Sequence, residues 1–293
     1  MKSLVIGLLV ISFFTTTVFS QVTSRILYKK VDTTSLYMDV LYPGKDLFPS
    51  PRPAIVFFFG GGWVTGTMQQ FINQAKYLTE RGLVCFLVDY RVKSRQGTTP
   101  FESLKDAKSS IRYIRSHAKE LGIIPDSIVA SGGSAGGHLA AATALIKDYN
   151  ESTDDESVSC VPNALVLFNP VIDNGPGGYG YERIGEQYKK FSPLHNIQKG
   201  APPTILFIGS HDKLIPVATV KNYEAKMENV GSRCELHIYE GMEHGFFNKP
   251  LYMANTLQLT DVFLASLGYI SGKPLLDRID YYKDLKKPEP GKL

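Results

Sequence analysis

The sequence predicts a single α/β domain, in which a mostly parallel sheet carries helices on both faces. Short apolar runs rich in Val, Ile, Leu and Phe alternate with longer segments of helical spacing, which indicates strands separated by crossover helices. The 293 residues are 43% hydrophobic and 20% charged, a balance that lets one large core form. Because crossovers are right-handed, the carboxyl ends of the parallel strands should meet at one edge of the sheet, where we expect the site.

The elements follow from this alternation in chain order. The segments 25–31 and 35–42 have strand composition and are joined by a tight turn at 32–34, so we expect them to pair antiparallel. Further strands are expected at residues 54–59, 83–90, 127–132, 163–171, 203–210 and 234–241. Helices are expected at residues 69–82, 100–122, 135–148, 217–231 and 255–268.

The first twenty residues have a different character. Lys2 precedes an apolar stretch from Leu4 to Phe14, and small and hydroxyl residues follow up to Ser20. This is typical of a cleavable secretory signal, so we expect residues 1–20 to be a signal peptide and the protein to be secreted or periplasmic. The alternative is an N-terminal membrane anchor, although the apolar stretch is shorter than a spanning helix requires.

We expect residues 21–293 to form one α/β domain with two irregular segments. The segment 171–197 is long and rich in Gly and Tyr, and we expect it to cover a pocket. The segment 272–293 is rich in Pro, Lys and Asp and is expected to be a peripheral tail. A net charge of +4 without a dense basic cluster argues against a nucleic-acid partner.

The three cysteines have no metal-ligand spacing. Cys85 lies in an apolar strand and reads as a small buried side chain. Cys160 and Cys234 each precede a predicted strand, and an exported protein would permit a disulfide between them. The sequence leaves that pairing open, and we expect neither a metal nor a cofactor.

Ser134 lies in Ser-Gly-Gly-Ser-Ala-Gly-Gly (131–137), between a predicted strand and a predicted helix. This is the setting of a nucleophile elbow with the pattern Gly-x-Ser-x-Gly. A strand-to-helix turn this sharp strains the serine backbone and brings Gly132 and Gly136 so close together that side chains would collide. The alternative is a glycine-rich turn that only packs a helix against a strand.

A nucleophilic serine needs a base, and His244 is the best placed of six histidines. It follows the strand predicted at 234–241, in a loop with Gly241 and Gly245. The other five lie in predicted helices, in mid-strand, in the long loop or directly after a strand (His117, His138, His237, His195 and His211).

The acid that orients this base is expected to be Asp212, just past the end of a strand and therefore at the same edge of the sheet. Asp126 precedes its strand and is excluded, whereas Asp173 is the reserve candidate. The resulting chain order of Ser134, Asp212 and His244 is the order of the α/β-hydrolases.

A second glycine cluster, Phe-Gly-Gly-Gly-Trp (59–63), also follows a predicted strand. The backbone N–H groups of Gly60, Gly61 and Ala135 are the expected oxyanion hole, because they can donate to the oxygen that becomes negative. A phosphate-binding loop is the alternative, but no Gly-Lys-Ser/Thr follows.

With these residues the chain resembles an α/β-hydrolase of the esterase/lipase kind, closest to the hormone-sensitive-lipase-like branch of bacterial carboxylesterases. The resemblance covers about residues 25–268 and rests on GGGW (60–63), DYR (89–91), GGSAGG (132–137), GSHD (209–212) and EHGFF (243–247). It implies the roles named above: Ser134 as nucleophile, His244 as base and acid, and Asp212 as its partner. One residue departs from the family: Phe59 stands where a histidine usually precedes the three glycines.

The expected activity is that of an exported serine carboxylesterase. It would hydrolyse short-chain acyl or carbohydrate-linked esters, acetyl or aromatic acyl, with no stable membrane insertion once the signal is cleaved. Two alternatives remain open. One is a prolyl-oligopeptidase-like serine peptidase, although the usual propeller is missing; the other is a catalytically silent binding module, although such modules typically lose a triad residue.

Overall fold

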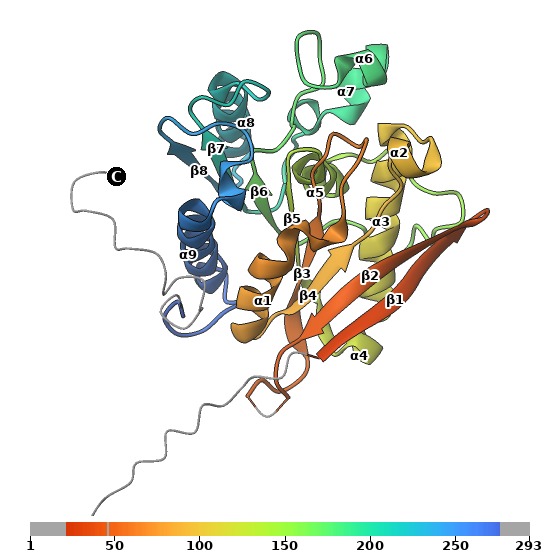
Figure 1. Ribbon diagram of the computed structural model, residues 1–293, viewed down its shortest axis with the longest axis vertical. Coiled ribbons are helices and arrows are strands. Elements are labelled where there is room, and N and C mark those ends of the chain that lie inside the picture. The colour runs from red at the N-terminus through yellow and green to blue at the C-terminus, as the bar shows by residue number, and fades with distance from the viewer. Residues whose placement is uncertain (1–21, 46, 276–293) are drawn as a thin grey trace, which may run out of the picture.

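The computed structural model describes residues 22–45 and 47–275 (Figure 1). The predicted signal peptide and most of the predicted tail lie outside these residues and stay predictions. Eight strands form one sheet in the order β1-β2-β4-β3-β5-β6-β7-β8. The strands are β1 (Val22–Val31), β2 (Thr34–Tyr42), β3 (Arg52–Phe58), β4 (Val84–Val88), β5 (Ile123–Gly133), β6 (Ala164–Phe168), β7 (Thr204–Gly209) and β8 (Cys234–Tyr239).

The pairing confirms the mostly parallel sheet with an antiparallel start. β1 pairs antiparallel with β2, and β2 pairs antiparallel with β4. Every later pair in the sheet, from β4–β3 to β7–β8, is parallel. The carboxyl ends of β3 and β5 to β8 therefore meet at one edge, as the crossover rule requires.

Two apolar layers cover the sheet, because successive side chains of the central strands point to opposite faces. In β3, Val56 and Phe58 belong to one core, whereas Ile55 and Phe57 belong to the other. The first core packs under α3 (Pro100–Ser116), α5 (Ala135–Leu145) and α8 (Val217–Asn229). The second packs under α1 (Ile72–Glu80) and α9 (Pro250–Ser266), which lie together on one side of the sheet in Figure 1.

Several helices differ from the sequence prediction. The helix predicted at 100–122 ends at Ser116, and a separate turn, α4 (Ala118–Leu121), follows. His117 breaks it with φ −101° and ψ 20°, and its Nδ1 lies 2.9 Å from the carbonyl oxygen of Tyr113. The last helix, α9, begins five residues earlier than expected, because Pro250 suits the first helical position. A short helix, α2 (Lys93–Gln96), was not predicted.

The segment 171–197 is folded into short helices. They are α6 (Tyr181–Ile184), η2 (Gly185–Gln187), α7 (Tyr188–Phe191) and η3 (Pro193–His195). α6 and α7 stand at the top of Figure 1, beyond α5 and α2. Phe191 anchors the segment, because its buried ring stacks on His138 of α5 at 4.4 Å between centroids.

All three cysteines are free thiols in the structure. Cys160 is buried, with its Sγ 3.8 Å from the carbonyl oxygen of Thr143. Cys234 starts β8, and burial raises the pKa of its thiol to about 12. The structure therefore does not form the disulfide that the sequence left open.

Candidate active site

Ser134 occupies the turn between β5 and α5 in a strained backbone conformation. Its φ is 54° and its ψ is −119°, a region that non-glycine residues rarely adopt. A Cβ on Gly132 would lie 2.4 Å from the carbonyl of Gly136, and one on Gly136 would lie 2.0 Å from the carbonyl oxygen of Phe58. The glycines on both sides are therefore required by the close approach of the backbone, as the sequence predicted.

His244 lies in the loop after β8 and faces Ser134. Its Nε2 is 2.9 Å from Oγ of Ser134, although the two residues are 110 positions apart in the chain. The ring is about one-fifth exposed, so a substrate can approach it from one side. The distance suits transfer of the hydroxyl proton to the ring.

Asp212 holds the other side of the imidazole. Its Oδ2 lies 2.7 Å from Nδ1 of His244, and its side chain is fully buried. Its Oδ1 accepts the backbone N–H groups of Leu214 and Ile215, both at 2.9 Å. The carboxylate is therefore held by the turn after β7 and can orient the ring of His244.

The reserve acid Asp173 is engaged elsewhere. Its Oδ1 lies 3.3 Å from Nε2 of His195 and accepts the N–H of Gly175 at 2.9 Å. Both side chains of this pair are about one-third exposed. The structure thus brings Asp212 to His244, and Asp173 to a different histidine.

The three predicted oxyanion donors do not have the same surroundings. Among the described residues, no acceptor is found for the backbone N–H of Gly61 or of Ala135 at the start of α5. The N–H of Gly60 instead donates to Oε1 of Gln70, at 2.6 Å. The N–H groups of Gly61 and Ala135 are therefore not engaged within the described residues, whereas Gly60 could receive a substrate oxygen only after Gln70 moves. The oxyanion roles of all three residues stay predictions.

The oxyanion loop is supported without the usual histidine. Phe59 stacks on Tyr90 with ring centroids 4.0 Å apart, and the Tyr90 hydroxyl donates to the carbonyl oxygen of Phe59 at 2.6 Å. From the other side, Arg183 of α6 donates to the carbonyl oxygen of Gly62. These contacts, with that of Gln70, hold the loop from Phe59 to Gly62 in place.

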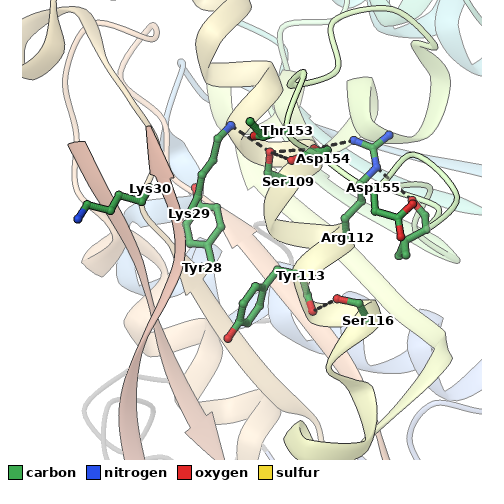
Figure 2. Close-up of a pocket in the computed structure, with 11 residues that line it drawn as sticks. Tyr28, Lys29, Lys30, Ser109, Arg112, Tyr113, Ser116, Thr153, Asp154 and Asp155 are labelled. Atoms are coloured by element: carbon green, nitrogen blue, oxygen red, sulfur yellow. Dashed lines mark hydrogen bonds and ion pairs between the residues drawn. The ribbon is translucent and has the colours of Figure 1, made fainter. Parts of the chain in front are cut away.

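A separate hollow of about 390 Å³ lies between β1 and α3 (Figure 2). Lys29 reaches across it to Ser109, which contacts Asp154, and Asp154 in turn pairs with Arg112 at 2.9 Å. Lys30 points the other way. Each charge that faces the hollow from these residues already has a partner, so the arrangement is that of a structural ion-pair cluster.

Within residues 22–45 and 47–275, no group of three or more His, Cys, Asp or Glu side chains could hold a metal ion. In the same residues no helix has both the length and the apolar character needed to cross a bilayer.

Two side chains at the site were missed by the sequence analysis. Asn169 directly follows β6, and its Nδ2 lies 3.3 Å from Nε2 of His244. The strand-end rule that found Asp212 could not find Asn169, because the strand was predicted to run to residue 171 whereas β6 ends at Phe168. Gln70 has no such signal, because it lies in the short helix η1 (Met68–Phe71) ten residues beyond the glycine it contacts.

This chain is similar to known proteins along most of its length. Residues 38–175 match the family model described as BD-FAE, and residues 170–258 match the dienelactone hydrolase family. The structure of Thermogutta terrifontis esterase 2 phosphoramylated by tabun is 43% identical, with a TM-score of 0.82, and the match covers 86% of this chain and 97% of that chain. The propionate-bound form of that esterase is 42% identical, with a TM-score of 0.80, covering 86% and 96%.

Curated relatives are more distant. The acetylxylan esterase of Xylanibacter ruminicola is 29% identical over 215 residues, which are 68% of this chain and 42% of that protein. The chain spans about half the length of the curated relatives it matches. The sheet order and the identity with Thermogutta terrifontis esterase 2 along nearly all of its length decide the family. This chain belongs to the α/β-hydrolase esterases.

Proposed function

We propose that the protein hydrolyses short-chain carboxylic esters through an acyl-enzyme formed on Ser134. The observation that carries this proposal is the pair of contacts made by one imidazole: His244 Nε2 to Ser134 Oγ at 2.9 Å, and His244 Nδ1 to Asp212 Oδ2 at 2.7 Å. A serine hydroxyl is a weak nucleophile until a base takes its proton, and this arrangement supplies an oriented base.

The steps follow from these positions. Oγ of Ser134 attacks the ester carbonyl carbon while its proton passes to Nε2 of His244. The carbonyl oxygen becomes negative within reach of the N–H groups of Gly61 and Ala135, and each such donor lowers the barrier by about 3 kcal/mol. The carbon–oxygen bond to the alcohol then breaks, and His244 returns the proton to the leaving oxygen. Water then attacks the acyl carbon in the same way, with His244 taking its proton. The bond to Ser134 breaks, which releases the acid and restores the serine hydroxyl.

A small acyl group is supported by the relatives of this chain. The related esterase 2 has been observed with propionate and butyrate, and another relative is an acetylxylan esterase. We therefore propose acetyl to butyryl esters, including acetyl groups on carbohydrate.

The test compares the wild type with Ser134→Ala on p-nitrophenyl acetate, butyrate and octanoate. We expect the wild type to prefer the two shorter esters, and the variant to lose at least about 10⁴-fold in kcat/KM. Acetylated and feruloylated xylan then test the carbohydrate substrate, and a peptide p-nitroanilide tests the peptidase alternative. Turnover that survives in Ser134→Ala would refute the assignment of the nucleophile.

We also propose that the protein is exported, with cleavage after Ser20. The support is the cationic start at Lys2, the apolar stretch from Leu4 to Phe14 and the small residue at the end. Expression in a host with a secretory pathway, followed by N-terminal sequencing, should give a mature protein that starts at Gln21. A chain that keeps Met1 and stays with the membrane would instead support an N-terminal anchor.

A further inference from the structure

Asn169 is a fully buried residue in the segment that follows β6. Its φ is 34°, in the left-handed region, and its backbone N–H donates to the carbonyl oxygen of Phe207 in β7 at 2.6 Å. Its neighbours contact the nucleophile: the carbonyl of Phe168 accepts the N–H of Ser134 at 2.9 Å, and the N–H of Val171 donates to the carbonyl of Ser134 at 3.1 Å. The segment from Phe168 to Val171 therefore fixes the backbone of Asn169 and the turn at Ser134 together.

The side-chain amide of Asn169 has one orientation that satisfies its neighbours. The backbone N–H of Gly245 lies 3.2 Å from Oδ1 of Asn169, and an N–H group can only donate. The oxygen of the amide must therefore face Gly245. Its nitrogen then faces Nε2 of His244, at 3.3 Å. The amide presents a donor to the ring because the backbone at Gly245 leaves it no alternative.

We propose that Asn169 is a positioning residue that keeps His244 in the tautomer with a lone pair on Nε2. The inference rests on the proposed function, in which that lone pair takes the proton of Ser134. Asp212 accepts from Nδ1 and Asn169 presents a donor to Nε2, so the two ring nitrogens are constrained in opposite senses. Within residues 22–45 and 47–275, the ring nitrogens are in hydrogen-bond contact with these two side chains and the Ser134 hydroxyl, from the ends of β7, β6 and β5.

The same donor disfavours a proton that stays on Nε2. Once Nε2 carries a proton, it faces the N–H of Asn169, and two donors without an acceptor repel each other. The proton is therefore passed on to the leaving alcohol. A carboxylate in the place of this amide would do the opposite and would stabilise the protonated ring.

The experiment replaces Asn169 by Asp. Asn169→Asp keeps an oxygen for the N–H of Gly245 but puts a carboxylate oxygen against Nε2. We expect the acid limb of the kcat/KM profile for p-nitrophenyl acetate to move up by about 1–2 pH units, with a loss of about 10–100-fold at pH 7.

Asn163→Asp is the matched control, because Asn163 lies just before β6 at the strand's other end. Its Oδ1 accepts the N–H of Ile128 at 3.1 Å, which Asp preserves. This variant should keep the wild-type pH profile. Asn169→Gly, which tolerates the positive φ and removes the amide, should lose about tenfold in kcat with little change in KM and no upward shift of the acid limb.

Nitrogen-15 NMR of the histidine rings gives a readout that does not depend on turnover. In the wild type we expect the His244 signals of a neutral ring protonated on Nδ1, and in Asn169→Asp those of a ring that stays protonated at higher pH. If no ester is hydrolysed at all, the proposed function fails but this spectrum still tests the positioning role. A folded Asn169→Asp whose pH profile and His244 spectrum match the wild type would overturn the proposal.

Discussion

The active-site edge and an ion-pair cluster between β1 and α3, made of Lys29, Arg91, Asp106 and Glu151, both bury charged side chains, yet they differ in how completely these are paired. In the cluster, the buried Asp106 accepts four bonds: from Nζ of Lys29 and from the backbone N, Nε and Nη2 of Arg91. Glu151 contacts the same two cations, at 3.0 and 3.1 Å. Every charge there has its complement, so the network ties β1 to α3 and to the segment around residue 151.

At the active-site edge some hydrogen-bond donors have no partner. Asp212 is fully engaged, and His244 lies between Asp212 and Ser134. Beyond Ser134, however, the N–H groups of Gly61 and Ala135 have no acceptor among the described residues. The difference shows how one fold uses buried polarity in two ways: a saturated network resists change, whereas an unsaturated one has donors ready for the charge that a reaction creates.

The largest expected effect is at Asp212. Asp212→Asn keeps an oxygen for Leu214 and Ile215 but turns an amide N–H towards Nδ1 of His244, which selects the wrong tautomer. We expect kcat to fall by about 10⁴-fold on p-nitrophenyl acetate, with an unchanged melting temperature. Asp173→Asn alters a second carboxylate–imidazole contact, with His195, and should change kcat by less than about threefold. Equal losses in both variants would mean that Asp212 acts through the fold alone.

The cluster should show the reverse pattern, with a loss of stability rather than of activity. Asp106→Asn leaves Lys29 and Arg91 buried with only part of their counter-charge, and we expect the free energy of unfolding to fall by about 3 kcal/mol. The specific activity of the folded variant at 25 °C should stay within about twofold of the wild type. Urea unfolding measures the first quantity.

The control for Asp106→Asn is an exposed ion pair. Glu235→Gln removes the partner of Arg233, whose side chain is 41% exposed, and should cost less than about 1 kcal/mol. A stability loss at Glu235 as large as that at Asp106 would show that pairing in the cluster is not what stabilises β1.

His138 is a buried polar side chain that is only partly paired. Within the described residues, one of its ring nitrogens has a partner, the carbonyl oxygen of Phe191, and the other has none. Burial lowers its pKa to about 4, although that contact opposes the shift. The unfolded chain therefore binds this proton near pH 6.5 while the folded chain does not. Stability contributed by neutral His138 is present above pH 6.5 and is lost as the pH falls towards 4, by about 2 kcal/mol between pH 7 and pH 5.

Unfolding of the wild type and of His138→Gln at pH 7 and pH 5 measures this contribution. Gln keeps a donor for the carbonyl of Phe191 and does not titrate, so the variant should lose about 2 kcal/mol less than the wild type between the two pH values. Parallel losses in both proteins would show that His138 takes up its proton while folded.

The smallest expected effect is at Gln70. Gln70→Ala removes the acceptor that holds the Gly60 peptide, and we expect the loosened oxyanion loop to lower kcat by about tenfold with little change in KM. Gln69→Ala is the control, because the neighbouring Gln69 donates to Asp39 instead. A rise in kcat/KM for Gln70→Ala would mean that the N–H of Gly60 serves the substrate and that Gln70 blocks it.

Much of this molecule follows from short-range pattern. Apolar runs and helical spacing placed the strands and most helices, because burial selects residues within each element. The strand-end rule placed Ser134, Asp212 and His244 at one edge. Helical spacing failed over 100–122, where His117 interrupts a pattern that spacing alone continues. The strand-end rule missed Asn169, because the predicted strand ran to residue 171 whereas β6 ends at Phe168.

By itself, the sequence determined the order of strands and helices, the elbow at Ser134 and the edge at which its partners gather, because these depend on local composition and on the handedness of crossovers. Only the tertiary structure decided that Gln70 holds Gly60, that Asn169 turns its nitrogen towards His244, and that Asp173 pairs with His195. Those contacts join residues on different elements. Their geometry depends on how the elements pack, which no single stretch of chain encodes.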